Sequence, residues 1–208
     1  MLGVVACGKN GADDPTPDKP DPKPTPGTET VINGTSIEST NTLVGLITDS
    51  KTGKGIAGVP VTDGYSFTTT DANGVYQFKA NRYCRNVYYT LPSEYKVALD
   101  KETKLPLFYS TSTISYNRND FVLEPLDSPE KNFTYLAIGD PQCKTDSDRE
   151  RFRTETLPDM RNFISTSQAN GKYKNVYIMS MGDITFDNTV QWKPMRNVMS
   201  KFSANGTD

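Results

Sequence analysis

Histidine is absent from the 208 residues of this chain, and its absence excludes several kinds of catalytic site. A Ser-His-Asp triad, a Cys-His pair and every histidine metal ligand need an imidazole ring. Any catalysis by these residues must therefore depend on carboxylates, amides, hydroxyls or a bound metal ion.

Long apolar runs and a strong excess of charge are also missing. No stretch of 18 apolar residues occurs, so the sequence predicts no membrane-spanning helix. The formal net charge is -2 and the basic residues do not cluster, which argues against nucleic-acid binding. The three cysteines, Cys7, Cys84 and Cys143, lie in different segments and form no evident disulfide framework. We interpret Cys84 and Cys143 as buried thiols.

The first seven residues are a short apolar run that ends in a small residue before a cysteine. This pattern resembles part of a bacterial lipoprotein signal and implies that Cys7 carries the lipid. Residues 1–7 are shorter than a full signal, so we expect the true start of the signal to lie upstream. The alternative is an ordinary buried cysteine near the start of the chain.

A proline-rich segment follows, in which six prolines fall between Pro15 and Pro26. Such a polar, acidic segment buries too little apolar surface to fold, and it favours extended polyproline II. We therefore predict a disordered tether over residues 8–38. Together with the lipid at Cys7, it predicts a membrane-anchored protein in the periplasm or at the cell surface.

Residues 39–127 are predicted to form a β-sandwich. Short runs rich in Val, Tyr, Thr and Phe alternate there with glycine and asparagine turns, at a spacing typical of two packed sheets. Three segments, 44–49, 55–64 and 70–76, resemble the Ig-like, carboxypeptidase regulatory-like module that precedes some bacterial calcineurin-like phosphoesterase domains. Asp49, Asp63 and Asp71 would fit a calcium loop, although isolated turn aspartates are far more common.

Residues 131–208 have the pattern of a strand, a helix and a second strand. Two apolar runs, over residues 132–138 and 176–181, predict buried parallel strands of a βαβ unit. Between them, the segment from Ser147 to Glu150 predicts a capping box, and Pro158 is expected to bend or split the helix. Apolar faces are predicted at Phe152, Leu157, Met160 and Ile164, and, in a second helix over residues 189–202, at Trp192, Met195 and Met199.

Both predicted strands end in Gly-Asp, at Asp140 and at Asp183. The carboxyl ends of parallel strands meet at one edge of the sheet, which is where open α/β sheets bind ligands. Two neighbouring carboxylates repel each other unless a cation lies between them. The two aspartates therefore predict a divalent metal site. The alternative is that they cap strand ends in an unrelated α/β domain.

The residues around these aspartates resemble the first two motifs of calcineurin-like phosphoesterases, Gly-Asp-x-His and Gly-Asp-x-x-x-Asp. The resemblance implies metal ligands at Asp140, Gln142 and Asp183, and it makes Asp187 a possible further residue of the second motif. Gln142 stands where histidine is usual and would bind through its amide oxygen. The resemblance also implies a pair of divalent ions, without distinguishing Mn, Fe or Zn, and leaves the catalytic residues unidentified.

The third motif of that family, Gly-Asn-His-Asp/Glu, does not occur in the sequence. We therefore expect a multidomain β plus α/β protein, in which residues 131–208 are the first βαβα part of an αββα domain. The predicted function is metal-dependent hydrolysis of a phosphate ester, with this truncated chain inactive by itself. The alternatives are a non-enzymatic surface lipoprotein whose sandwich binds a protein or glycan, and a purely structural spacer.

Overall fold

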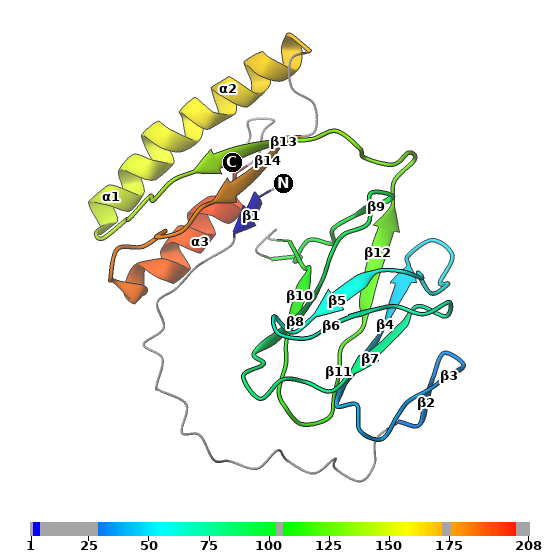
Figure 1. Ribbon diagram of the computed structural model, residues 1–208. Coiled ribbons are helices and arrows are strands. Elements are labelled where there is room, and N and C mark those ends of the chain that lie inside the picture. Colours follow the sequence, from blue (N-terminus) through cyan, green and yellow to red (C-terminus); the bar gives the residue numbers. More distant parts are fainter. Residues whose placement is uncertain (1, 5–28, 103–105, 172–175, 203–208) are drawn as a thin grey trace. The chain divides into compact units, whose positions relative to one another are not determined.

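The computed structural model describes residues 2–4, 29–102, 106–171 and 176–202. The described residues divide into two compact units (Figure 1). The β-rich unit contains residues 29–98 and 107–130, and the α/β unit contains residues 2–4, 131–171 and 176–202 together with residues 99–102 and 106. Strands outnumber helices among the described elements, so the expected β-rich character is confirmed.

Two sheets enclose the core of the β-rich unit. The first has the strand order β10–β8–β5–β6, with strands Tyr109–Thr111, Asn86–Tyr89, Pro60–Thr62 and Phe67–Thr69. The second has the order β11–β4–β12–β9, with β7 paired to β4 and strands Asn117–Arg118, Leu43–Asp49, Phe121–Pro125, Tyr95–Lys96 and Val75–Phe78. Buried side chains from both sheets form one cluster that includes Ile47, Val61, Val87 and Leu123.

The strand β12 shows how the sequence pattern builds this core. Phe121 and Leu123 are buried, while Val122 between them is exposed, as the alternation of side chains along a strand requires. Tyr76 is fully buried in the same core, and its hydroxyl donates a hydrogen bond of 2.6 Å to the carbonyl of Asn119. Burial and the nearby Asp120 carboxylate raise the pKa of Tyr76 far above its ordinary value.

A short hairpin precedes this unit, within the segment that the sequence predicted to be a tether. The strands β2 (Val31–Ile32) and β3 (Thr35–Ser36) pair in antiparallel register. Ile32 is buried against Val44 and Val75, and Thr35 donates a hydrogen bond of 2.5 Å to Asp71. The predicted boundary of the tether at residue 38 is therefore wrong, because long-range contacts order these residues. Residues 8–28 and Cys7 lie outside the described residues, and the lipid anchor stays a prediction.

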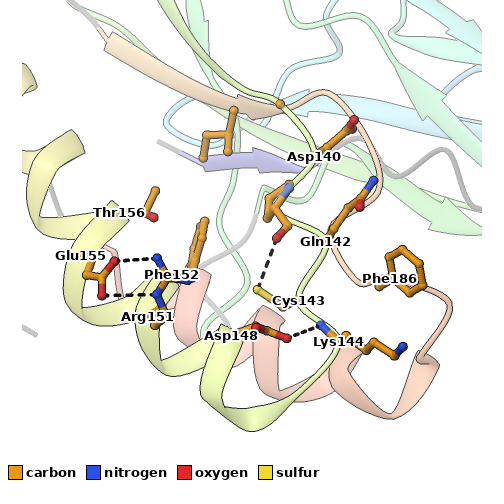
Figure 2. Close-up of a pocket in the computed structure, with 13 residues that line it drawn as sticks. Asp140, Gln142, Cys143, Lys144, Asp148, Arg151, Phe152, Glu155, Thr156 and Phe186 are labelled. Carbon is orange, nitrogen blue, oxygen red and sulfur yellow. Dashed lines mark hydrogen bonds and ion pairs between the residues drawn. The ribbon is translucent and has the colours of Figure 1, made fainter.

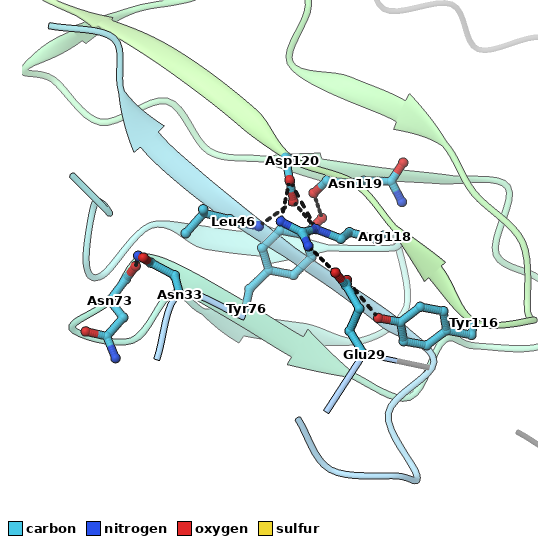
Figure 3. Close-up of polar contacts among 9 residues, drawn as sticks. All are labelled: Glu29, Asn33, Leu46, Asn73, Tyr76, Tyr116, Arg118, Asn119 and Asp120. Carbon is cyan, nitrogen blue, oxygen red and sulfur yellow. Dashed lines mark hydrogen bonds and ion pairs between the residues drawn. The ribbon is translucent and has the colours of Figure 1, made fainter. Parts of the chain in front are cut away.

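An ion-pair network fastens the residues before this hairpin to the β-rich unit (Figure 3). The guanidinium of Arg118 pairs with Glu29 at 2.6 Å and with Asp120 at 2.8 Å. Asp120 also accepts a hydrogen bond of 2.9 Å from the backbone N–H of Leu46 in β4. The network therefore joins the N-terminal entry of the unit to its central strand.

The α/β unit has a parallel sheet of order β1–β14–β13, with strands Leu2–Val4, Val176–Ser180 and Thr134–Ile138. Its helical segments are α1 (Asp146–Arg151), the π-helical turn η1 (Phe152–Thr156), α2 (Leu157–Ala169), the 3-10 turn η2 (Thr189–Gln191) and α3 (Trp192–Ser200). No helix in the described part of the chain combines the length and apolar character needed to cross a bilayer.

The helices of this unit pack against the sheet through most of the apolar residues that the sequence predicted. The prediction was wrong for Trp192, which is 38% exposed. Phe152, Leu157, Met160, Ile164, Met195 and Met199 are all buried in one cluster with Ile178 of β14.

The strand β1 consists of three residues that the sequence predicted to belong to the partial signal. Cleavage before Cys7 would remove this strand, so one molecule cannot have both a cleaved signal and β1.

Candidate functional site

The strands β13 and β14 end side by side, and hydrogen bonds join the loops that follow them. Ile138 is paired with Ser180 at the strand ends. The backbone N–H of Gln142 donates to the carbonyl of Asp183 at 2.8 Å, and that of Cys143 donates to the carbonyl of Ile184 at 3.1 Å. The structure thus places the loops of Asp140 and Asp183 at one edge of the sheet, as expected, while the role of these residues as ligands stays a prediction.

The three predicted ligands share an unusual backbone conformation. Asp140, Gln142 and Asp183 have φ values of 26°, 43° and 39°, in the left-handed region. Among the described non-glycine residues, Asn33 is the one other with a positive φ. Such a conformation costs a non-glycine residue on the order of 1–3 kcal/mol, and strained residues tend to cluster at functional sites. We refer to Asp140, Gln142 and Asp183 as the strained triad.

Two members of the strained triad line a pocket of about 510 Å³ (Figure 2). Its wall is formed by residues 138–144 at and after the end of β13, by Asp148, Arg151, Phe152, Glu155 and Thr156 of the first helix, and by Phe186 after β14. A volume of this size suits a small-molecule ligand. Asp183 and Asp187 are exposed and do not belong to the lining, although Asp183 adjoins it through the hydrogen bond from Gln142.

The donor atoms of the strained triad are two carboxylates and one amide. Within the described residues, no group of three or more His, Cys, Asp or Glu side chains is arranged to hold a metal ion. A set of oxygen donors suits a hard divalent cation, which completes its shell with water or substrate oxygens. By the chemistry of its donor atoms the strained triad suits such an ion, while metal binding by these residues stays a prediction.

A π-helical turn forms the helical wall of the pocket. The N–H of Leu157 donates to the carbonyl of Phe152 across this turn, directly before Pro158, which has no N–H to donate. The expected split at Pro158 does not occur, because the widened turn carries the helix through from α1 to α2. Since Glu155 and Thr156 of the turn line the pocket, it belongs to the candidate site, as π turns often do.

The first helix is capped by Thr145 rather than by the predicted box from Ser147 to Glu150. The Thr145 hydroxyl accepts a hydrogen bond from the N–H of Asp148 at 3.2 Å, and the Asp148 carboxylate accepts one from the N–H of Thr145 at 2.9 Å. Hydrogen bonds from Thr145 hold the pKa of Asp148 below its ordinary value. The prediction was wrong because Ser147 already lies inside the helix.

Replacing Thr145 by alanine is expected to destabilise the α/β unit by about 1 kcal/mol, since it removes this cap. Ser147→Ala is the matched control and is expected to stay within about 0.5 kcal/mol of the wild type. Urea unfolding followed by the fluorescence of Trp192, the single tryptophan, measures this unit. Equal losses in the two variants would contradict the assignment of the cap to Thr145.

A buried amide connects the starts of the two helices and was not identified from the sequence. Gln191 is 6% exposed, donates to the Asp146 carboxylate at 2.9 Å and accepts a hydrogen bond from Arg149. The hydrogen bond from Gln191, followed by one of 2.8 Å from Arg149 to the same carboxylate, lowers the pKa of Asp146. Asn188 also donates to the carbonyl of Lys144 at 2.8 Å. The loop after β14 is therefore held against the loop after β13.

Cys143 lies beside the strained triad but is not activated for chemistry. Its thiol is buried and donates to the carbonyl of Pro141 at 3.7 Å. Burial, with a smaller effect of the Asp148 carboxylate, raises the pKa of Cys143. A neutral thiol in this position contributes packing rather than nucleophilic attack. Both Cys84 and Cys143 are free and buried, as predicted.

The turn aspartates of the β-rich unit accept hydrogen bonds from the backbone. Asp49, Asp63 and Asp71 each accept hydrogen bonds from two backbone N–H groups within four residues of their own positions. Asp63 is also buried and accepts a third such bond from Asn81. These hydrogen bonds are typical of ordinary turn aspartates.

Comparison with known families gives one match, which covers residues 41–126 and is described as the N-terminal region of calcineurin-like phosphoesterase. This range contains β4 to β12 of the β-rich unit, so the resemblance of this unit to the region that precedes calcineurin-like phosphoesterase domains is confirmed. No curated protein matches the chain. The strained triad lies outside the matched range, and its assignment therefore depends on its own motifs and geometry.

Proposed function

We propose, on the premise that residues 41–126 are the N-terminal module of a calcineurin-like phosphoesterase, that this protein serves metal-dependent hydrolysis of phosphate esters. The observation that carries the proposal is the strained triad at two hydrogen-bonded strand ends, beside a pocket of small-molecule size. In this interpretation, the β-rich unit is an Ig-like sandwich. The α/β unit is the first part of an αββα phosphoesterase domain.

The strained triad has a defined part in this chemistry. Asp140 and Asp183 would hold a divalent ion through carboxylate oxygens, and Gln142 would hold it through its amide oxygen. When bound, such an ion polarises a phosphoryl oxygen and lowers the pKa of coordinated water. The hydrogen bond from the Gln142 N–H to the Asp183 carbonyl fixes the two loops to each other. The loops that carry the proposed ligands are therefore held together before the ion binds.

The donor set also favours particular ions. Zinc sites in proteins use mainly nitrogen and sulfur ligands, whereas this chain contains no histidine and Cys143 is occupied by its contact with Pro141. Carboxylate and amide oxygens suit Mg²⁺ or Mn²⁺. Since such an ion also relieves the repulsion between two neighbouring carboxylates, we expect Mn²⁺ to bind at this site.

The proposal is tested by titrating the whole chain with Mn²⁺ in a calorimeter. Asp183→Asn is expected to weaken Mn²⁺ binding at least about tenfold, because it removes a charged ligand. Asp159→Asn makes the same change of charge at an exposed position of α2, outside the pocket, and is expected to leave the affinity unchanged. Hydrolysis of 4-nitrophenyl phosphate in the presence of Mn²⁺ is measured in parallel.

The two measurements separate metal binding from catalysis. Equal Mn²⁺ affinity in the wild type and in Asp183→Asn would show that the strained triad does not hold the ion. Binding that depends on Asp183, without hydrolysis of the ester, would support the metal site and agree with the expected inactivity of this chain by itself.

A further inference from the structure

We propose that Lys144 and Phe186 form a substrate subsite beside the strained triad, with Lys144 attracting the phosphoryl group and Phe186 contacting an aromatic leaving group. The inference depends on the proposed function and names the substrate class, which is phosphate esters of aromatic alcohols. Both residues line the pocket together with Asp140 and Gln142 (Figure 2). They come from the two loops that carry the strained triad, one after β13 and one after β14.

Lys144 is the cation of the pocket that is available to an anion. The other cation of the lining, Arg151, is paired with Glu155 at 3.2 Å. The carboxylate of Asp148 accepts hydrogen bonds from the backbone of Lys144 and from Thr145, rather than from the ammonium of Lys144. Within the described ranges, that ammonium forms no ion pair, and it lies 5.2 Å from the centre of the Phe186 ring.

Phe186 is placed at the rim of the pocket by its neighbours. Ile184, two residues earlier, is buried in the core of the unit, and Asn188, two residues later, is hydrogen-bonded to the carbonyl of Lys144. The Phe186 ring between these two anchors remains 42% exposed. An aromatic ring held at a pocket rim can contact a planar ring of a ligand, and such contacts are specific in geometry.

Lys144 and Phe186 together predict a preference for aromatic phosphate esters that neither residue would give alone. An ammonium attracts any phosphoryl dianion, so Lys144 strengthens binding without regard to the leaving group. A ring–ring contact strengthens binding only for aromatic esters, by roughly fivefold at the usual strength of aromatic pairs. A purely structural cation–π pair would instead change the stability of the loops and leave the preference among ligands unaltered.

The test compares two ligands with the same head group that cannot be hydrolysed, phenylphosphonate and methylphosphonate. Their affinities for the full chain are measured by calorimetry in excess Mn²⁺. The wild type is expected to bind phenylphosphonate about fivefold more tightly. Phe186→Ala is expected to bring the ratio close to one. Lys144→Gln is expected to weaken both ligands by a similar factor, roughly five- to tenfold, and to keep the ratio.

Two control variants change similar residues outside the pocket. Phe163→Ala removes a ring that is 47% exposed on α2, and Lys193→Gln removes an exposed charge on α3. Both are expected to keep the wild-type affinities and their ratio. Phe186→Leu retains apolar bulk without a ring, so it carries the test if Phe186→Ala fails to fold, as judged from the fluorescence of Trp192.

The outcomes separate this inference from the proposed function. Equal affinities of the wild type for the two phosphonates, or a ratio that Phe186→Leu leaves unchanged, overturn the subsite, even if Mn²⁺ binds. Absence of phosphonate binding overturns it as well. A preference for the aromatic ligand that depends on Phe186 supports the subsite, and it does so even if Asp183→Asn shows no effect on Mn²⁺ binding and the metal proposal fails.

Discussion

Replacing Gly45 by alanine is expected to unfold the β-rich unit or to destabilise it by more than about 3 kcal/mol. A Cβ atom on Gly45 would lie 1.9 Å from the carbonyl oxygen of Asn119 and 2.6 Å from the Tyr76 ring. Neither neighbour is free to move, because Tyr76 is fully buried and donates its hydrogen bond to that same carbonyl. The strand β4 is equally constrained, since it pairs with β7, β11 and β12.

Hydrogen exchange with mass spectrometry measures this effect for each unit separately. Peptides from β4 and β7 are expected to lose protection in Gly45→Ala, while peptides from β13 and β14 keep theirs. Gly53→Ala is the control, because no atom lies within 4 Å of its added Cβ and its φ of +68° alone accounts for a cost of about 1 kcal/mol. Wild-type protection of β4 in Gly45→Ala would contradict the packing described for Tyr76 and Asn119.

Local patterns were sufficient to predict the larger elements of this protein. The alternation around Phe121 predicts a strand with one buried face, and the apolar runs before Asp140 and Asp183 predict buried strands. The helical spacing of Phe152, Leu157 and Ile164 predicts the face that packs against the sheet. These predictions succeeded because a strand or helix that buries one face repeats its apolar residues at a fixed period.

Elements that depend on distant residues could not be predicted in this way. The hairpin of β2 and β3 has only two residues in each strand, and contacts such as that of Thr35 with Asp71, 36 residues away, help to order it. The helix start was misplaced because both Thr145 and Ser147 begin a plausible capping pattern, and only the backbone decides between them. The widening of the helix before Pro158 likewise depends on which carbonyl groups can accept hydrogen bonds.

The candidate site, too, was predicted only in the part that depends on local patterns. Asp140, Gln142 and Asp183 were found from their motifs and from the rule that ligands bind at the carboxyl edge of a sheet. Their left-handed backbone and the contact of Lys144 with Phe186 were not, because both lie where two loops 41 or more residues apart come together. The structure therefore adds the pocket and the Lys144 ammonium to the two motifs that the sequence showed.

The family resemblance and the proposed chemistry depend on different parts of this protein. The confirmed match covers residues 41–126 in the β-rich unit, whereas the strained triad and its pocket belong to the α/β unit. A measurement that depends on the α/β unit alone is therefore the stronger test of function. Trp192, at the start of α3, makes such a measurement possible, because it is the single tryptophan of the chain.

Ile178→Ala is expected to destabilise the α/β unit by about 2–5 kcal/mol. Ile178 is 1% exposed at the centre of β14, where it packs in the core shared by both helices. Val190→Ala removes a side chain that is 77% exposed and is expected to change the free energy of unfolding by less than about 0.5 kcal/mol. Urea unfolding followed by Trp192 fluorescence compares the two variants, and similar midpoints would contradict the described core.

The same measurement links stability to the strained triad. An ion that binds only the folded unit stabilises it by about 2.7 kcal/mol at a hundred times its dissociation constant. Mn²⁺ at that concentration is expected to offset a large part of the loss in Ile178→Ala, because the ligand loops follow β13 and β14 and remain intact in this variant. Asp183→Asn, in which binding is at least about tenfold weaker, is expected to gain at most about 1.4 kcal/mol at the same Mn²⁺ concentration. Equal stabilisation of Asp183→Asn and Ile178→Ala would place the ion outside the strained triad and leave the strain at Asp140, Gln142 and Asp183 without a ligand to explain it.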